Sequence, residues 1–353
     1  MNLLVTGGAG FIGSNLISHI MDRREISRLV NLDALTYAGQ AENISEFRSH
    51  PKYVFEQIDL RNYSDVLGVL RRHDITHVIH LAAESHVDRS ITGPAPFVET
   101  NVLGTFHLLE SCRALWPDCQ KGSRHRFLHV STDEVYGSLG PTGKSSETSP
   151  YAPNSPYAAS KASSDFFVRA WARTFGLPTL ITNCSNNFGP RQFPEKLIPV
   201  VIQSALDRKP IPVYGDGQQV RDWLFVRDHT EALWQVLTRG RIGEAYNIGA
   251  ENELPNLRLV EMLCELVDEL APHPSGSAKS LIQFVEDRPG HDRRYALDAS
   301  KIRAELGWHP QHDFKSALRE TVHWYVENQA WVATVLTKKS VAPAASDNAW
   351  EQR

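Results

Sequence analysis

The chain has 353 residues, of which 41% are hydrophobic and 22% are charged, and its formal net charge is −4 at pH 7. This length predicts about two domains with a large buried core, which excludes a small scaffold held together by disulfides. The balanced charge predicts neither a nucleic-acid partner nor an anionic membrane surface. No apolar run reaches the roughly 18 residues of a transmembrane helix, so we expect no membrane association.

The beginning of the chain and its cysteines bear on its location. A strand-like run starts directly after Met1 and leaves no room for a signal peptide. The cysteines are scattered and form no Cys-x-x-Cys pair: they are Cys112, Cys119, Cys184 and Cys264. This pattern is typical of buried thiols in a reducing compartment. We therefore expect a cytoplasmic protein.

Short apolar runs alternate with longer segments of helical period as far as about residue 185. The runs of strand character are Leu3–Thr6, Leu29–Leu32, Tyr53–Ile58, His77–Leu81, Phe127–Ser131 and Thr179–Thr182. Their near-continuous apolar character is typical of parallel strands that are buried on both faces. The alternation predicts an α/β fold with a doubly wound, Rossmann-type parallel sheet.

One helix is delimited especially clearly. Ser155 can cap its first turn, Pro156 suits its first position, and Gly176 followed by Pro178 ends it. This helix places Tyr157 and Lys161 four residues apart on one face.

The pattern becomes irregular after residue 185, where Gly and Pro are frequent, before helical stretches near 228–239, 256–271 and 313–333. We expect a smaller, mostly C-terminal α/β domain that binds the substrate. The expected organisation is a dinucleotide-binding domain at 1–185, with parts of 225–250 returning to it, a second domain at 186–335, and a mobile tail at 338–353.

A glycine-rich turn follows the first predicted strand and reads Thr6-Gly-Gly-Ala-Gly-Phe-Ile-Gly13. Gly7 permits the tight turn, Gly10 lets the backbone approach a diphosphate, and Gly13 allows close packing of the helix on the strand. The spacing alone also occurs in ordinary tight connections. Its place between a strand and a helix favours a dinucleotide site.

Asp33 ends the second predicted strand, about 20 residues beyond Gly13, where a carboxylate accepts hydrogen bonds from the adenosine ribose. It would repel a 2′-phosphate, and the following Ala-Leu-Thr-Tyr supplies no Arg. NAD is therefore favoured over NADP. The alternative for Asp33 is a loop cap.

Tyr157 and Lys161 form a Tyr-x-x-x-Lys pair. A phenol with a pKa of about 10 is a weak base, but a neighbouring ammonium and an oxidised nicotinamide both favour the phenolate. Taken alone, the pair could equally be a surface aromatic beside a solvated Lys. Combined with the glycine-rich turn, it indicates a site of hydride transfer.

These features, together with Ser131-Thr-Asp-Glu-Val-Tyr-Gly137, resemble the extended short-chain dehydrogenase/reductase family. More specific segments resemble the nucleoside-diphosphate-glucose 4,6-dehydratases, above all those of dTDP-glucose, from Met1 to about residue 335. They are Asp33 to Gly39, Ala82 to Ser90, Ser131 to Gly137, Asn186 to Gln192 and Arg288 to Asp292. Gly39-Gln40 stands where that family usually has Gly-Asn, a departure on the adenosine side.

The resemblance implies a hydro-lyase that makes a 4-keto-6-deoxy sugar and regenerates its NAD without releasing it. Tyr157 would take the C4 hydroxyl proton, with Lys161 beside it and Thr132 bonded to the substrate hydroxyl. Glu134 would remove the C5 proton while Asp133 protonates the departing C6 hydroxyl. Neighbouring carboxyls titrate as a pair, so Asp133 is expected protonated and Glu134 charged. The alternative is that both are solvated loop residues.

The resemblance also assigns binding residues. Those near NAD are Gly7, Gly10, Phe11, Ile12, Gly13, Asp33, Asp59, Leu81, Ala83, Thr100, Tyr157, Lys161 and Asn187. Those near the nucleotide sugar are Ser85, Thr132, Asp133, Glu134, Asn186, Lys196, Leu197, Tyr214, Arg221, Asn256, Arg288 and His291. The guanidinium fork suits a diphosphate, so Arg221 and Arg288 are the expected anchors. We expect no metal, because His77 and His80 would point to opposite faces of a strand.

Two other functions remain open. A UDP-sugar 4-epimerase or a UDP-glucuronate decarboxylase would share Tyr157, Lys161 and the glycine-rich turn, but not the need for both Asp133 and Glu134. A non-catalytic dinucleotide-sensing protein would need no intact set of Thr, Tyr and Lys. The family further implies a homodimer with a four-helix interface, here from helices at about 95–115 and 156–175. Whether the sugar carries thymidine or uridine is left open.

Overall fold

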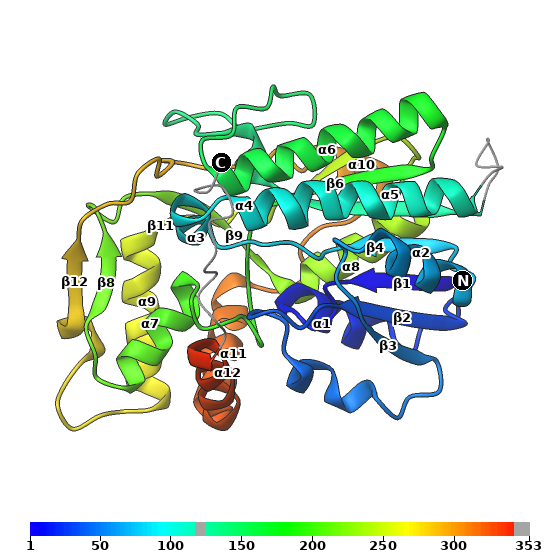
Figure 1. The fold of residues 1–353 in the computed structure, drawn as a ribbon. Coiled ribbons are helices and arrows are strands. Elements are labelled where there is room, and N and C mark those ends of the chain that lie inside the picture. Colours follow the sequence, from blue (N-terminus) through cyan, green and yellow to red (C-terminus); the bar gives the residue numbers. More distant parts are fainter. Residues whose placement is uncertain (117–123, 342–353) are drawn as a thin grey trace, which may run out of the picture.

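A computed structural model describes residues 1–116 and 124–341 and places the strands predicted before residue 185 in one parallel sheet (Figure 1). This seven-stranded sheet has the order β10-β6-β5-β4-β1-β2-β3. Its strands are β1 (Asn2–Thr6), β2 (Arg28–Asp33), β3 (Tyr53–Gln57), β4 (His77–His80), β5 (Arg126–Thr132), β6 (Thr179–Cys184) and β10 (Ala245–Ile248). The predicted doubly wound α/β fold is confirmed.

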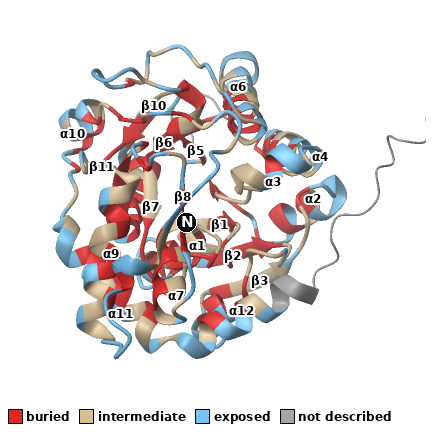
Figure 2. Ribbon diagram, turned by 90° about the vertical axis from the view of Figure 1, so that its left-hand side faces the viewer, coloured by how far each residue is buried: buried red, intermediate tan, exposed pale blue. Residues whose placement is uncertain are grey.

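Alternate residues of each strand face two different helical layers. Leu3 and Val5 of β1 pack in one core with α1 (Phe11–Ile20), α8 (Val226–Arg239) and α10 (Ser300–Leu306). Leu4 packs on the other side with α2 (Tyr63–Arg72), α5 (Gly104–Leu115) and α6 (Pro156–Phe175). Figure 2 shows the consequence: the central strands are buried along their length, whereas the outer helices are exposed on one side.

The chain after residue 185 builds smaller sheets and a third core. A three-stranded sheet has the order β11 (Glu253–Pro255), β9 (Val220–Phe225), β7 (Asn186–Phe188), and β12 (Ile282–Val285) pairs with β8 (Ile211–Tyr214). The third core joins apolar residues of α7 (Leu197–Leu206), α9 (Asn256–Leu270) and α11 (Phe314–Glu327). In Figure 1 the strand β1 points toward this group, which therefore lies beyond the carboxyl edge of the large sheet.

Several predicted boundaries need correction at the C-terminal end. The helical stretch predicted at 313–333 is two helices, because α11 ends at Glu327 and α12 (Gln329–Val341) begins after Asn328. The helix α12 also continues past Lys338, where the irregular tail was predicted to begin. Residues 342–353 of that predicted tail lie outside the described residues.

Short helical segments complete the fold. They are η1 (Ala41–Phe47), α3 (Val87–Thr92), α4 (Ala95–Phe97), the π-helical η2 (Val98–Leu103), η3 (Asp133–Tyr136) and η4 (Ala278–Leu281). The helix predicted at about 95–115 is thus a continuous run of α4, η2 and α5 with a π-helical middle.

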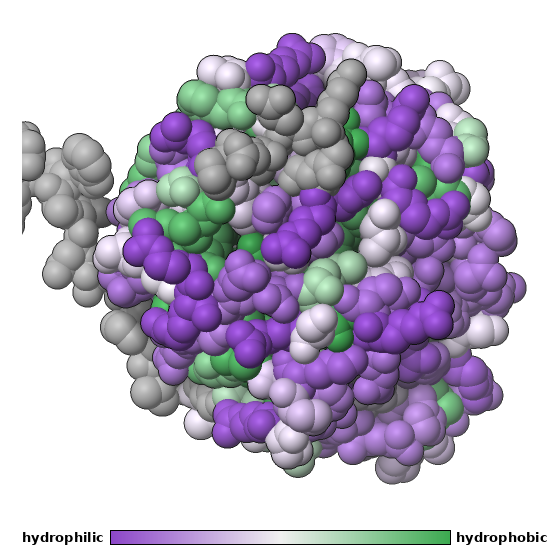
Figure 3. Space-filling view, turned by 90° about the vertical axis from the view of Figure 1, so that its right-hand side faces the viewer, coloured by the Kyte–Doolittle hydropathy of each residue, from purple (hydrophilic) through white to green (hydrophobic). Residues whose placement is uncertain are grey.

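Three of the four cysteines can be located. Cys112, Cys184 and Cys264 are buried, and Cys119 lies outside the described residues. Figure 3 shows the face near the amino ends of the strands, where hydrophilic residues dominate and apolar residues form only separate small patches. Within residues 1–116 and 124–341, no helix combines the length and the apolar character that crossing a membrane requires.

Candidate active site

The glycine-rich turn lies between β1 and α1 and leaves no space for side chains at two of its positions. Gly7 has φ +72°, and a Cβ added there would lie 2.7 Å from the Ala82 nitrogen. A Cβ added to Gly13 would lie 2.2 Å from the Gly7 carbonyl oxygen. No side chain caps the start of α1, and its first turn holds no acidic residue. The first amides of α1 are therefore open to an anionic group.

Asp33 lies directly beside this turn. One carboxylate oxygen accepts a hydrogen bond from the Ala9 amide (2.9 Å), and the other accepts one from the Leu35 amide (2.8 Å). Burial raises the pKa of Asp33, while these two hydrogen bonds lower it. The carboxylate thus caps its own loop, as the alternative proposed, and also stands at the place where the ribose interaction was predicted.

The structure brings together the residues predicted for catalysis. Thr132 ends β5, and its hydroxyl lies 3.3 Å from the Glu134 amide and 3.2 Å from the Asp133 carboxylate. The Thr132 side chain also lies close enough to the phenol of Tyr157 to lower its pKa. Ser155 caps α6 as predicted, accepting a hydrogen bond from the Ala158 amide at 3.1 Å, and this cap fixes the start of the helix that carries Tyr157.

Burial strongly perturbs the basic groups of this cluster. Desolvation raises the pKa of Tyr157 well above its usual range, the charge of Glu134 raises it further, and the Thr132 hydrogen bond lowers it. The Lys161 ammonium is buried and donates a hydrogen bond to the Val130 carbonyl at 2.8 Å. Desolvation lowers the pKa of Lys161 to about 8, and the nearby charge of Asp165 opposes that shift. The two groups thus carry a proton each near pH 7.

The two neighbouring acids differ in their surroundings. Asp133 is only 3% exposed, so the alternative of a solvated loop carboxylate is wrong for this residue. Burial and then the charge of Glu134 raise the pKa of Asp133 well above its usual range. Burial also raises the pKa of Glu134, but three cations lower it, in the order Arg221, Arg288 and Lys196. Asp133 therefore holds a proton more readily than Glu134 does.

The cations around Glu134 come from three segments after residue 185. Arg221 on β9 is buried and donates to the Asp292 carbonyl at 2.9 Å. Lys196, just before α7, donates to the Ser85 carbonyl at 2.7 Å. Arg288 pairs with Asp88 at 2.8 Å. This cluster of positive charge fits the diphosphate that the sequence predicted there.

Some buried polar atoms at predicted binding positions have no hydrogen-bond partner among the described residues. They are Asp133 Oδ2, Asn186 Oδ1, Asn187 Oδ1, Asn256 Oδ1 and Arg288 Nε. An unpaired buried polar atom is costly, so native proteins rarely leave one without a function. Similar atoms also occur outside these positions, but at the predicted cofactor and substrate positions bound ligands could supply the missing partners.

Other predicted residues take the following places. Phe11 and Ile12 open α1, Leu81 and Ala83 follow β4, Thr100 lies on η2, Leu197 opens α7, and Asn256 opens α9. The rings of Tyr214 and His291 lie 6.3 Å apart, and His291 contacts Asp287 at 2.6 Å. His80 contacts the hydroxyls of Thr6 (2.7 Å) and Thr105 (2.9 Å).

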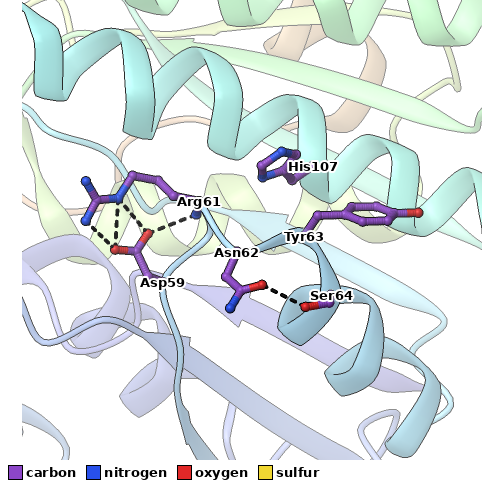
Figure 4. A pocket seen from close by; sticks show the side chains of 6 residues that line it. All are labelled: Asp59, Arg61, Asn62, Tyr63, Ser64 and His107. Atoms are coloured by element: carbon purple, nitrogen blue, oxygen red, sulfur yellow. Dashed lines mark hydrogen bonds and ion pairs between the residues drawn. The ribbon is translucent and has the colours of Figure 1, made fainter.

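Asp59 is held differently from the other predicted cofactor residues. Figure 4 shows its carboxylate hydrogen-bonded to Arg61 in an open surface pocket that Asn62, Tyr63, Ser64 and His107 also line. Arg61 pairs with Asp59 at 2.7 Å and also with Glu99 at 3.0 Å. The Asp59 carboxylate, just after β3, is therefore paired with the Arg61 guanidinium in this structure.

Sequence reasoning missed two residues that tie the site together. Asn101 accepts from the Glu84 amide and donates to Ser160, both at 2.8 Å, which joins the segment after β4 to α6. Asp165 accepts hydrogen bonds from Ser131 (2.9 Å) and Tyr151 (2.8 Å). Its position one turn after Lys161 was a usable signal, because it continues the face of Tyr157 and Lys161.

Comparison with known proteins agrees with this geometry. The family model described as GDP-mannose 4,6 dehydratase matches residues 4–321. The chain is 56% identical over 340 residues to the dTDP-glucose 4,6-dehydratase of Neisseria meningitidis serogroup B, covering 95% of this chain and 96% of that protein. It is 52% identical over 346 residues to dTDP-glucose 4,6-dehydratase 1 of Escherichia coli K12, with 95% of each covered.

Solved structures rank the dehydratases above the epimerases. The dTDP-glucose 4,6-dehydratase DesIV of Streptomyces venezuelae, solved with NAD bound, superimposes with a TM-score of 0.87 at 44% identity, covering 95% of this chain and all of that one (100%). The UDP-glucose 4-epimerase of Thermus thermophilus, also with NAD, has a TM-score of 0.81 at 30% identity, with 93% and 100% covered. The chain therefore belongs to the nucleotide-sugar 4,6-dehydratase family, in which its similar relatives are dTDP-glucose 4,6-dehydratases.

Proposed function

We propose that this chain is an NAD-dependent hydro-lyase that converts dTDP-glucose to dTDP-4-keto-6-deoxyglucose. The observation that carries the proposal is the position of two adjacent acids, the buried Asp133 and the partly buried Glu134, beside Thr132 and Tyr157 at the end of β5. Oxidation at C4 alone needs only Thr132, Tyr157 and Lys161, whereas elimination across C5 and C6 also needs an acid and a base.

The glycine-rich turn and Asp33 support NAD as the cofactor. The open amides of α1 suit a diphosphate, and the carboxylate beside the turn disfavours a 2′-phosphate. When bound, NAD supplies a hydride acceptor for C4 and later the hydride that reaches C6. The orphaned Asn187 oxygen is a suitable acceptor for an N–H group of the cofactor.

Tyr157 is the proposed base for the C4 hydroxyl. The neighbouring Thr132 hydroxyl would hydrogen-bond the same substrate oxygen and lowers the pKa of the phenol. Burial and Glu134 keep the phenol protonated until positive charge approaches it. The Lys161 ammonium, one turn along the same helix, would supply part of that charge and stabilise the phenolate.

Glu134 and Asp133 are proposed to carry out the elimination. A ketone at C4 acidifies the C5 hydrogen, which Glu134 takes as a proton, while Asp133 donates its proton to the C6 hydroxyl that leaves as water. Glu134 then returns a proton to C5. The surroundings support this division, since three cations favour the Glu134 carboxylate and burial favours the protonated Asp133.

The nucleotide part of the substrate is proposed to lie between the carboxyl edge of the sheet and the elements after residue 185. This places the boundary between a dinucleotide-binding domain and a nucleotide-sugar domain near residue 185. Lys196, Arg221 and Arg288 would hold the diphosphate there. The other proposed contacts are Ser85, Asn186, Leu197, Tyr214, Asn256 and His291.

Purified protein tests the proposed reaction directly. With dTDP-glucose and no added reductant, we expect a base-sensitive 4-keto chromophore. Kinetics with UDP-glucose and GDP-mannose, measured alongside, decide the nucleotide preference. Formation of a C4 epimer, or of carbon dioxide from a UDP-glucuronate substrate, in place of the 4-keto product would overturn the proposal in favour of the epimerase or decarboxylase alternative.

We also propose that the protein is a cytoplasmic homodimer whose α5 and α6 pair with those of a second copy. Figure 1 shows these helices side by side, and α6 exposes two large apolar residues, Phe166 (54% exposed) and Phe175 (48% exposed). Exposed large apolar side chains favour a protein interface. Sedimentation should find a dimer for the wild type and a monomer for Phe166→Glu, and a wild-type monomer would contradict the pairing.

A further inference from the structure

Two loops flank the glycine-rich turn at the carboxyl edge of the sheet. The strand order β4-β1-β2 places the segment after β4 on one side of the turn and the segment after β2 on the other. Tyr37 belongs to the segment after β2, and Arg89 lies on α3, after β4. A side-chain bridge between these segments therefore joins the neighbours of β1, the strand that the turn follows.

Such a bridge is present. The centre of the Arg89 guanidinium lies 3.8 Å from the centroid of the Tyr37 ring, in a cation–π contact. The Tyr37 hydroxyl donates a hydrogen bond to the Glu195 carboxylate at 3.0 Å. Phe193 packs edge-on against the same ring, with centroids 5.7 Å apart. Tyr37 therefore joins segments from three distant parts of the chain.

The surroundings of Tyr37 and Glu195 stabilise the hydrogen bond between them. The side chain of Glu195 is only 4% exposed, so water competes weakly for its hydrogen bond. Burial raises the pKa of the Tyr37 phenol, and the charges of Glu195 and Glu84 raise it further. The phenol therefore remains a donor throughout the neutral pH range, and its hydrogen bond to a carboxylate is charge-assisted.

We propose that Tyr37, Arg89 and Glu195 form a clasp that retains NAD in the protein between and during turnovers. The inference rests on the proposed function. A dinucleotide seated on the glycine-rich turn lies below the bridge, and it can leave along this edge only if Tyr37 separates from Arg89 and Glu195. Retention serves the reaction, because a hydride removed from C4 must return to the same sugar at C6.

The chain contains a matched control for the clasp. Tyr246 donates a hydrogen bond to Glu305 at 2.8 Å, and the Lys301 ammonium lies 4.8 Å from its ring centroid. This trio also consists of a tyrosine, a glutamate and a cation. It joins β10 to α10, and β10 is an edge strand of the sheet, separated from β1 by β6, β5 and β4. The variant Tyr246→Phe thus removes a similar hydrogen bond away from the glycine-rich turn.

The test measures NAD release from the purified holoenzyme. Wild type, Tyr37→Phe, Arg89→Met, the double variant and Tyr246→Phe are each diluted into an excess of an NAD-consuming dehydrogenase that traps released cofactor. Substrate is omitted, because Lys196 and Asp88, next to Glu195 and Arg89, belong to the substrate side. We expect release about fivefold faster for each single variant and at least tenfold faster for the double variant, as one hydrogen bond and one cation–π contact imply.

The outcomes separate this inference from the function on which it rests. Release that is unchanged in both single variants and in the double variant overturns the clasp. Equally fast release from Tyr246→Phe also overturns it, since the effect would then be a general loss of stability. A wild-type protein that binds no NAD overturns the proposed function instead. Arg89→Met tests the clasp independently if Tyr37→Phe fails to fold.

Discussion

The catalytic side of the site is built on the ends of two regular elements, whereas its cationic side comes from three segments far apart in the chain, one of them the strand β9. Thr132 ends β5, and Tyr157 and Lys161 lie near the start of α6. By contrast, Lys196 is held by the Ser85 carbonyl and Arg221 by the Asp292 carbonyl. The backbone of β5 and α6 positions the first group, and hydrogen bonds to carbonyls of distant segments hold Lys196 and Arg221 of the second.

The two sides also differ in what shifts the pKa values of their acids and bases. On the catalytic side burial dominates and shifts the pKa of Asp133, Tyr157 and Lys161 away from their usual ranges. On the cationic side positive charges partly offset that burial at Glu134. Changes on the catalytic side should therefore alter rates and stability, whereas changes on the cationic side should alter mainly the binding of the nucleotide sugar.

The largest expected effect belongs to the proposed base. Glu134→Gln should lower product formation by about 10³-fold, within the range for loss of a general base, while reduced nicotinamide still appears after substrate is added. Rapid mixing monitored by nicotinamide absorbance and by C5 proton exchange checks both parts. The control is Glu231→Gln, because Glu231 lies on α8, pairs with Arg23 and has no place in the proposed site. Full turnover by Glu134→Gln would show that another group removes the C5 proton.

The next effect concerns the stability cost of burying Lys161. Its pKa is lowered to about 8 in the folded protein from 10.5, so the unfolded chain binds more protons between these values and the free energy of unfolding rises with pH. Without cofactor, Lys161→Met should be about 2 kcal/mol more stable than wild type at pH 7. This net gain already subtracts about 1 kcal/mol for the lost hydrogen bond to Val130. The gain should shrink toward pH 10.5.

Urea unfolding at several pH values measures this difference. Lys209→Met, at an exposed lysine paired with Asp207, should show no comparable pH dependence. A Lys161→Met variant that is less stable than wild type at pH 7 would contradict a net cost of burial at this position.

A smaller effect is expected on the cationic side. Arg288→Met should raise the KM for dTDP-glucose about tenfold, the loss expected for one charge-assisted contact to the diphosphate, and should change kcat less. Steady-state kinetics check the split, and Arg258→Met on α9, where Arg258 pairs with Glu261, is the control. A roughly tenfold fall in kcat with an unchanged KM would contradict this prediction and would show that Arg288 acts in the chemical step.

Local signals were sufficient where a residue acts through its own strand or helix. The strand runs, the Ser155 cap and the four-residue spacing of Tyr157 and Lys161 could all be predicted, because period and capping are properties of neighbouring residues. The break at Asn328 was missed, since α11 and α12 together read as one helical stretch. The roles of Asn101 and Asp165 were missed as well, because each depends on partners that are remote in the sequence.

The sequence by itself determined the doubly wound sheet, the glycine-rich turn between a strand and a helix, and the set of groups available for chemistry. Only the tertiary structure decided the protonation preferences of Asp133 and Glu134, because these depend on burial and on cations contributed from after residue 185. It alone also brought Tyr37, Arg89 and Glu195 into contact. Periodicity reports which face of an element is buried, but desolvation and charge act through space between segments that the chain order separates.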